Sequence, residues 1–178
     1  MAIGVRPEIT LAKNAGLETA RGIIVNENLQ TSNPDIYAGG DGVEIKDFVT
    51  GENTLIPLAG PANRQGRIIA DNICGIESAY KNSQGASVLK VFDLTAASVG
   101  NNEKQLKSKN IPYWKTFVFS KDHAGYYPGA VEVLYKLLFS PDGKILGAQG
   151  VGLDGVEKRI DVISSIMRNG GKIQELLD

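Results

Sequence analysis

One residue that could do chemistry is a carboxylate that directly follows two glycines. Asp41 comes after Gly39 and Gly40, and these glycines follow a short apolar run at 36–38. Because glycines lack side chains, a ligand can approach their backbone closely, and a carboxylate can accept hydrogen bonds from sugar-like hydroxyls. Taken alone, Gly-Gly-Asp is more typical of a plain turn after a strand. The segments around it therefore decide its meaning.

A second candidate is the tyrosine pair Tyr126 and Tyr127, in segment 122–130. A phenol can donate a hydrogen bond to a developing thiolate or hydroperoxide anion. Both rings could instead fill core or interface space, as aromatic side chains often do. His123 is the only histidine and precedes the pair. For His123 the sequence favours orienting the loop or hydrogen-bonding a substrate over transferring a proton.

The only cysteine, Cys74, is a poor candidate for a catalytic thiol. Reactive cysteines occur in electropositive, partly exposed places, often at the start of a helix. Cys74 lies near the end of a predicted helix, where the negative end of the helix dipole disfavours a thiolate. We expect it to be a small buried filler.

Composition narrows the class of protein. The chain has 178 residues with 42% hydrophobic composition, enough for one large domain or for one domain plus part of another. Its 19 basic and 20 acidic residues nearly balance, and no basic stripe points to nucleic acid. No apolar run approaches the ~20 residues that span a membrane, and no signal peptide is visible. A cytoplasmic location is the default, and a lone cysteine agrees with a reducing compartment.

The pattern along the chain predicts two units joined by a polar linker at 76–86. For the first unit, residues 1–80, apolar spacing and turn residues predict a helix at 9–15, a short buried strand at 36–38, a small hairpin with strands at 48–50 and 54–56, and a helix at 58–73. For the second unit, residues 87–178, they predict strands at 87–92, 113–119, 131–139 and 145–151, and helices at 103–107, 156–168 and from 172. The second unit is predicted to be an α+β domain with an antiparallel sheet and helices on one face. Because both ends of the chain are abrupt, we expect it to be truncated.

Two segments in the first unit carry a family resemblance. Segment 31–41 has a threonine, spacer residues, an apolar strand ending in alanine, and then Gly-Asp. It resembles the second FAD motif of the pyridine-nucleotide:disulfide reductase family. In that family a helix of the form Leu-Ala-x-x-Ala-x-x-Gln-Gly-Arg follows, and residues 58–67 read Leu-Ala-Gly-Pro-Ala-Asn-Arg-Gln-Gly-Arg.

This resemblance implies a half-site for FAD. Asp41 would hold the ribityl chain, and Gly40 would let the backbone approach it. Leu58, Ala59 and Gly60 would face the pyrimidine edge of the flavin, mainly through backbone N–H groups at the positive end of a helix dipole. The implied fold is an α/β remnant of an FAD/NAD(P)-binding domain followed by an α+β dimerisation domain.

The second unit resembles the interface domain of the same family over its whole length. Segment 122–130, Asp-His-Ala-Gly-Tyr-Tyr-Pro-Gly-Ala, looks like the His-x-x-Tyr-Tyr-Pro-Gly stretch of coenzyme A-disulfide reductases and persulfide reductases. The resemblance implies a homodimer in which Tyr126, or next Tyr127, reaches the partner's active site. The His-Pro pair of the two-cysteine reductases is missing, so His123 does not match it. Lys158 and Arg159 could face coenzyme A phosphates, although an exposed helix face is favoured.

The function implied is that of a flavoprotein fragment. The parent enzyme would use NAD(P)H to reduce coenzyme A disulfide or a persulfide through FAD and a redox cysteine upstream of this chain. The first unit contains no Gly-x-Gly-x-x-Gly, and no redox cysteine is present, so the isolated chain is expected to be inactive. Three alternatives stay open: an NADH oxidase or peroxidase of the same family, a non-catalytic dimerisation module, and an unrelated α+β binding protein.

Overall fold

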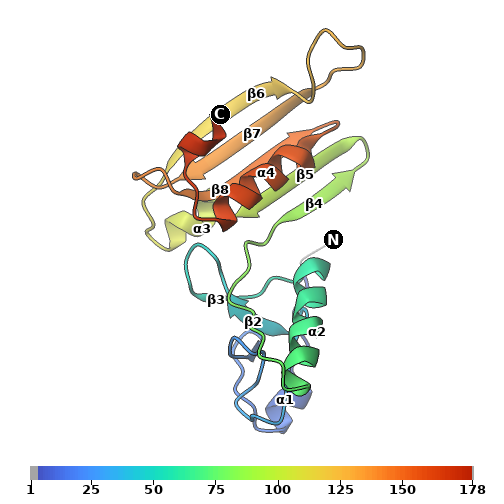
Figure 1. The fold of residues 1–178 in the computed structure, drawn as a ribbon, viewed down its shortest axis with the longest axis vertical. Helices are drawn as coiled ribbons and strands as arrows, with labels where there is room; N and C mark the ends of the chain where they lie inside the picture. Colours follow the sequence, from blue (N-terminus) through green and yellow to red (C-terminus); the bar gives the residue numbers. More distant parts are fainter. Residues whose placement is uncertain (1–3, 178) are drawn as a thin grey trace. The chain divides into compact units, whose positions relative to one another are not determined.

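The structure, a computed structural model, describes residues 4–177. Residues 1–3 and 178, which the two domain predictions include, lie outside the described residues. The chain divides into two compact units, Met1–Ser83 and Gln84–Asp178 (Figure 1).

The first unit combines a small mixed sheet with one long helix. Its elements are α1 (Thr10–Asn14), β1 (Ile23–Ile24), β2 (Val43–Lys46), β3 (Asn53–Thr54) and α2 (Ala59–Ile73). The sheet order is β1-β2-β3, with β1 parallel and β3 antiparallel to β2. Its buried core is formed by Leu29, Val43, Ile45 and Tyr80, against which Ile68 and Ile69 of α2 pack. The apolar stripe of α2 therefore attaches the helix to the sheet.

Two local expectations for this unit were wrong. The predicted strand at 36–38 forms an isolated bridge between Tyr37 and Gln30, because its backbone partners lie in the adjacent turn. The predicted strand at 48–50 is a turn. The Asp47 carboxylate accepts the N–H groups of Val49 at 3.0 Å and Thr50 at 2.8 Å, which removes these donors from any ladder.

Strand β2 was missed because a buried glutamate interrupts its apolar pattern. Glu44 is buried in the middle of the strand. Its carboxylate accepts the backbone N–H groups of Arg21 at 2.6 Å and Gly22 at 2.9 Å. These bonds offset the cost of burying the charge and attach the segment before β1 to β2.

The second unit is a five-stranded antiparallel sheet covered on one face by a helix. Its elements are β4 (Ser87–Val91), β5 (Leu94–Gly100), α3 (Glu103–Ser108), β6 (Trp114–Lys121), β7 (Glu132–Phe139), β8 (Ile145–Gly152), α4 (Val156–Arg168) and the 3₁₀ helix η1 (Ile173–Leu176). The strand order is β4-β5-β8-β7-β6. In Figure 1, α4 lies across β5 and β8. The predicted fold class is confirmed.

Small residues of β8 let α4 approach the sheet. A Cβ atom on Gly150 would lie 2.8 Å from Val156 of α4 and 2.8 Å from the Tyr135 ring of β7. The buried face of α4 consists of Val156, Ile160, Ile163 and Met167. Strand β5 was not predicted, because its inward residues include threonine and alanine, which give a weak alternating signal.

Helix α3 is attached to the sheet by a charged cluster around Glu103. The Glu103 carboxylate accepts hydrogen bonds from Lys136 of β7, from the Tyr113 hydroxyl at 2.8 Å and from Lys115 at 3.1 Å. The Lys136 bond, followed by those from Tyr113 and Lys115, lowers the pKa of Glu103 from its ordinary 4.5 to about 2.

This cluster predicts a specific loss of stability in acid. Because the folded-state pKa is lowered, the contribution of Glu103 is present above pH 4.5 and is lost as the pH falls towards 2. In urea unfolding, Glu103→Gln is expected to reduce the fall of the unfolding midpoint between pH 4.5 and pH 2. It is also expected to lower the midpoint at pH 7. Glu132→Gln, at an exposed glutamate of β7, is the matched control. Identical pH profiles for Glu103→Gln and the unmodified chain would contradict this role.

Candidate functional site

The Gly-Gly-Asp turn is held on α2 by a buried glutamine. A Cβ atom on Gly39 would lie 2.9 Å from the Ile69 side chain, so a larger residue would clash with the helix. Gly40 has φ +84, and its N–H donates to the Gln65 side-chain oxygen at 2.6 Å. Gln65 is 1% exposed. The turn is therefore fixed, and Asp41 follows it at the exposed surface of this unit.

The start of α2 offers backbone donors. The N-cap residue Leu58 is extended, and no side chain caps the helix. The first helical bond runs from the Ala62 N–H to the Leu58 carbonyl at 3.1 Å. Within residues 4–177, the N–H groups of Ala59 and Gly60 have no acceptor, and the space beside Gly60 is open. These donors sit at the positive end of the helix dipole and suit a partial negative charge.

The turn and the helix start are held at a defined separation because both are attached to α2. Gln65 lies six residues after Ala59, which corresponds to roughly 9 Å along the helix axis. A ligand bound at both places must carry hydroxyls at one end and hydrogen-bond acceptors at the other. A ribityl flavin has this arrangement, so the predicted residues Gly40, Asp41, Ala59 and Gly60 fit the group. Leu58 offers no free backbone donor there, because its N–H donates to the Ile56 carbonyl at 2.9 Å.

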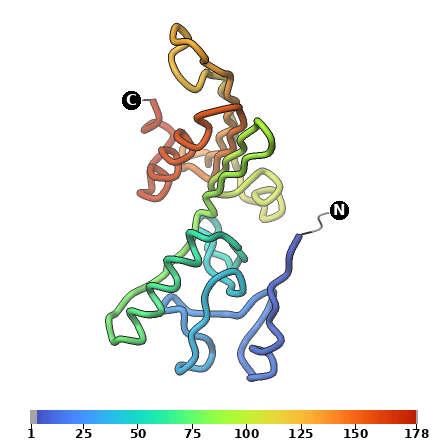
Figure 2. The backbone as a smooth tube through the Cα atoms, turned by 90° about the vertical axis from the view of Figure 1, so that its right-hand side faces the viewer, coloured from blue at the N-terminus to red at the C-terminus, as the bar shows by residue number. Residues whose placement is uncertain are grey.

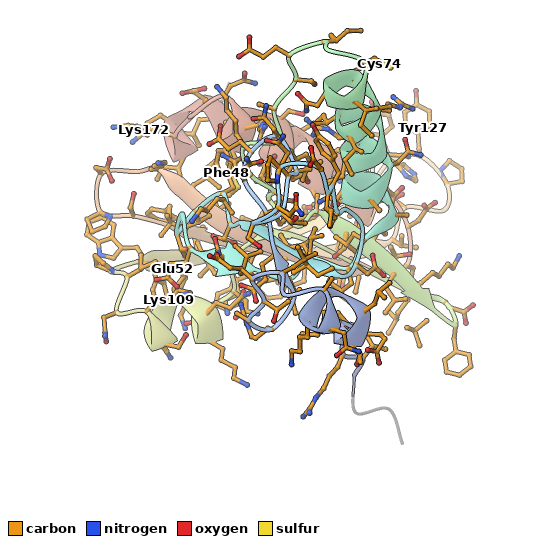
Figure 3. All side chains as sticks on the ribbon, turned by 90° about the horizontal axis from the view of Figure 1, so that it is seen from below. Phe48, Glu52, Cys74, Lys109, Tyr127 and Lys172 are labelled. Atoms are coloured by element: carbon orange, nitrogen blue, oxygen red, sulfur yellow. The ribbon has the colours of Figure 1, made fainter. Side chains whose placement is uncertain are left out.

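The tyrosine pair lies on the loop between β6 and β7, which projects past the ends of these strands (Figures 1 and 2). Tyr126 is 84% exposed and Tyr127 is 60% exposed. Their ring centroids are 4.8 Å apart, and Tyr127 is labelled in Figure 3. Within the described part of the chain, neither hydroxyl has a hydrogen-bond partner. Both phenols are therefore free to donate to a ligand or to a partner molecule.

Asp122 and His123 stand at the base of this loop. Asp122 accepts the Val131 N–H at 2.8 Å and contacts the His123 ring nitrogen Nδ1 at 2.7 Å. The Val131 N–H, with a further contribution from His123, holds the pKa of Asp122 below its ordinary value. The His123 ring also lies 6.5 Å from the Tyr127 ring. This position suits the expected loop-orienting role of His123.

Two side chains lie elsewhere than expected. Cys74 is exposed at the C-terminal end of α2, as Figure 3 shows, so the prediction of a buried filler was wrong. The apolar side chains around it are also exposed, so nothing in the described residues covers the thiol. Arg159 is half-buried and donates to backbone carbonyls, whereas Lys158 is exposed.

Gln65 and Asp122 were not recognised as site residues from the sequence. Gln65 falls on the apolar stripe of α2 at helical spacing, which was the available signal that it faces inward. Asp122 directly precedes the lone histidine, but its bond to Val131 spans the loop and has no sequence signature.

Comparison with family models covers both units. The model for the pyridine nucleotide-disulphide oxidoreductase dimerisation domain matches residues 86–178, and the pyridine nucleotide-disulphide oxidoreductase model matches residues 1–66. The chain belongs to this family. Members of the family are enzymes that use FAD and NAD(P)H.

Curated relatives carry names of different oxidoreductase activities. An NADH oxidase of Methanocaldococcus jannaschii is 43% identical over 165 residues, covering 92% of this chain and 37% of the relative. A coenzyme A disulfide reductase of Staphylococcus epidermidis is 36% identical over 180 residues, covering 99% of this chain and 41% of the relative. The chain therefore spans about two fifths of the length of these relatives.

Solved structures of the family superpose closely on this chain. The reduced CoADR-RHD protein of Bacillus anthracis gives a TM-score of 0.95 at 55% identity, covering 98% of this chain and 32% of that one. An NAD-dependent persulfide reductase from A. fulgidus gives a TM-score of 0.94 at 40% identity, covering 97% of this chain and 33% of that one.

No helix in residues 4–177 has the length and apolar character needed to cross a membrane.

Proposed function

We propose that this chain is part of a longer flavoprotein that uses NAD(P)H to reduce a disulfide or persulfide of the coenzyme A class. In this proposal the redox cysteine lies upstream of residue 1, and residues 1–80 and 87–178 are the partial nucleotide-binding domain and the dimerisation domain. The observation that carries the proposal is the exposed tyrosine pair, with two unpartnered hydroxyls on a projecting loop. Coenzyme A disulfide reductase and persulfide reductase relatives support the substrate class.

Residues of the first unit would hold FAD in this enzyme. When bound, FAD accepts hydride from NAD(P)H and passes the electrons to the disulfide. The carboxylate of Asp41 would accept hydrogen bonds from ribityl hydroxyls, with Gly40 fixed by Gln65. The N–H groups of Ala59 and Gly60 would donate to the pyrimidine edge.

Tyr126 and Tyr127 would serve the substrate. A phenol hydroxyl that donates to the sulfur anion leaving a cleaved disulfide stabilises its developing charge. Placing this phenol in the partner's active site requires a homodimer. An apolar row across the sheet face away from α4 supports such an assembly. From β4 to β6 this row consists of Leu89, Ala96, Val151, Leu134 and Phe119.

A second candidate is an NADH oxidase or peroxidase of the same family. The Methanocaldococcus jannaschii relative favours it, because its identity to this chain is 43%. Here the phenol would donate to a hydroperoxide anion instead of a thiolate. The same loop geometry serves both chemistries, so the substrate has to be measured.

The longer protein provides the test of the proposal. It is expected to purify with flavin absorbance and to oxidise NAD(P)H when coenzyme A disulfide or a persulfide is added, with little oxidation under oxygen alone. Faster oxidation with oxygen than with either sulfur substrate would favour the oxidase. A colourless dimer without turnover would contradict the proposal and would indicate a non-catalytic dimerisation module.

Asp41→Ala in the longer protein tests the cofactor site. Loss of a charge-assisted hydrogen bond is expected to weaken FAD binding by about 10- to 100-fold, measured by fluorescence titration of the apoprotein. Asp35→Ala removes the same charge from an exposed position six residues earlier and is expected to leave the affinity unchanged. Equal affinities for the two variants would exclude the assigned role of Asp41.

A further inference from the structure

The tyrosine loop is closed at its neck. The Asp122 N–H donates to the Val131 carbonyl at 3.0 Å, and the Val131 N–H donates to the Asp122 carboxylate at 2.8 Å. One backbone bond and one side-chain bond therefore join Asp122 and Val131 directly after the Lys121–Glu132 pair, where the β6–β7 ladder ends. The neck therefore has a fixed width, while the tip that carries Tyr126 and Tyr127 is exposed.

One side chain of α4 attaches this neck to the body of the unit. The Arg159 guanidinium donates to the Lys121 carbonyl at 3.0 Å and to the Asp122 carbonyl at 3.2 Å. Both carbonyls lie where β6 ends and the loop begins. A planar guanidinium can satisfy two adjacent acceptors at once, whereas a lysine ammonium is a point charge. The geometry thus limits the direction in which the loop leaves the sheet.

Neighbouring contacts fix Arg159 itself. Its guanidinium carbon lies 5.8 Å from the centroid of the buried Tyr135 ring. The Tyr135 hydroxyl donates to the Val156 carbonyl in the first turn of α4 at 3.3 Å. A Cβ atom on Gly155, which has φ +67, would lie 3.2 Å from the Asp122 Cβ, so this glycine lets the neck approach the helix. Strand β7, helix α4 and the loop neck therefore form one packed junction.

We infer that Arg159 is a positioning residue that sets the orientation of the tyrosine loop through the carbonyls of Lys121 and Asp122. Two of its five N–H donors are directed to these carbonyls. The consequence for catalysis rests on the proposed function, in which Tyr126 reaches a reacting sulfur. The orientation of the loop can be measured without that function.

The first measurement is amide hydrogen exchange of segment 120–132 in the 178-residue chain. Arg159→Ala is expected to speed exchange at Asp122 and Val131 at least tenfold, because two charge-assisted bonds are lost. Lys158→Ala, which removes the same charge from the adjacent exposed residue, is expected to leave it unchanged. Unchanged exchange in folded Arg159→Ala would overturn the inference. If this variant fails to fold, Arg159→Lys decides: faster exchange supports the inference, and wild-type exchange overturns it.

The second measurement is turnover of the longer enzyme. Arg159→Lys is expected to lower kcat for the disulfide substrate at least fivefold, while KM for NAD(P)H stays constant. The loss should disappear in a Tyr126→Phe background, because the two residues act through the same hydroxyl. The same loss in that background would overturn the positioning role. Faster neck exchange with unchanged kcat would support the loop assignment and reject the catalytic role of the tyrosine.

Discussion

Replacing Tyr126 with phenylalanine is expected to lower kcat of the longer enzyme for coenzyme A disulfide by about 100-fold, the usual cost of removing one donor to a developing anion. The side chain is 84% exposed and its hydroxyl has no partner among residues 4–177, so the change removes a donor without disturbing packing. KM for NAD(P)H should stay constant, because the role proposed for the phenol is to donate to the sulfur substrate. Steady-state kinetics with each substrate varied in turn measures both values.

Tyr127→Phe is the matched comparison. Tyr127 is more covered, at 60% exposure, and its ring lies against Tyr126 and near His123. We expect a smaller loss of kcat, because this ring supports its neighbour. If neither single variant nor the double variant changes turnover, the tyrosines are interface residues and the donor role is wrong.

Gly147→Ala is expected to destabilise the second unit by about 3 kcal/mol or more, in the range of severe overpacking. A Cβ atom there would lie 2.2 Å from the Asn101 carbonyl oxygen and 2.9 Å from the Asn101 nitrogen. Both are backbone atoms held by the β5–β8 pairing and by the Asn101 N–H bond to Leu146, so neither can move aside. Urea unfolding of the 178-residue chain measures the free-energy difference.

Gly170→Ala separates steric overlap from backbone strain. Gly170 has φ +76, and a Cβ atom there would have nothing within 4 Å. Its substitution should cost about 1 kcal/mol through strain alone. Equal costs at the two glycines would show that the strands separate to accept the methyl group, which would argue against a rigid β5–β8 contact.

The long helices were predictable because their signal is local. Helix α4 was predicted at 156–168 and runs over Val156–Arg168, and α2 differs from its prediction by one residue at its start. Each has apolar residues at three- and four-residue spacing, ended by a glycine-containing turn. Segments whose backbone N–H groups donate to side chains showed no such spacing of apolar residues. The turn after Asp47 and the buried Glu44 in β2 are the two cases.

Much of the candidate site could be predicted from residues that are consecutive in the sequence. The Gly40–Asp41 step, the start of the Leu58 helix and the tyrosine pair each consist of consecutive residues, so their types and spacing could be read directly. The exposure of Cys74 could not be read in this way. Its neighbours in sequence are apolar, but burial depends on whether another element packs against them.

By itself, the sequence determined the family and the α/β and α+β classes of the units, and it predicted which residues would meet a flavin or a disulfide, because these follow from short-range patterns. Only the tertiary structure decided how these residues are held. Gln65 reaches Gly40 across 25 residues, and Arg159 reaches Asp122 across 37. The partner in each pair is a backbone N–H or a backbone carbonyl. Every residue has both groups, apart from proline, which lacks the N–H. The residue type at that position therefore does not indicate the contact.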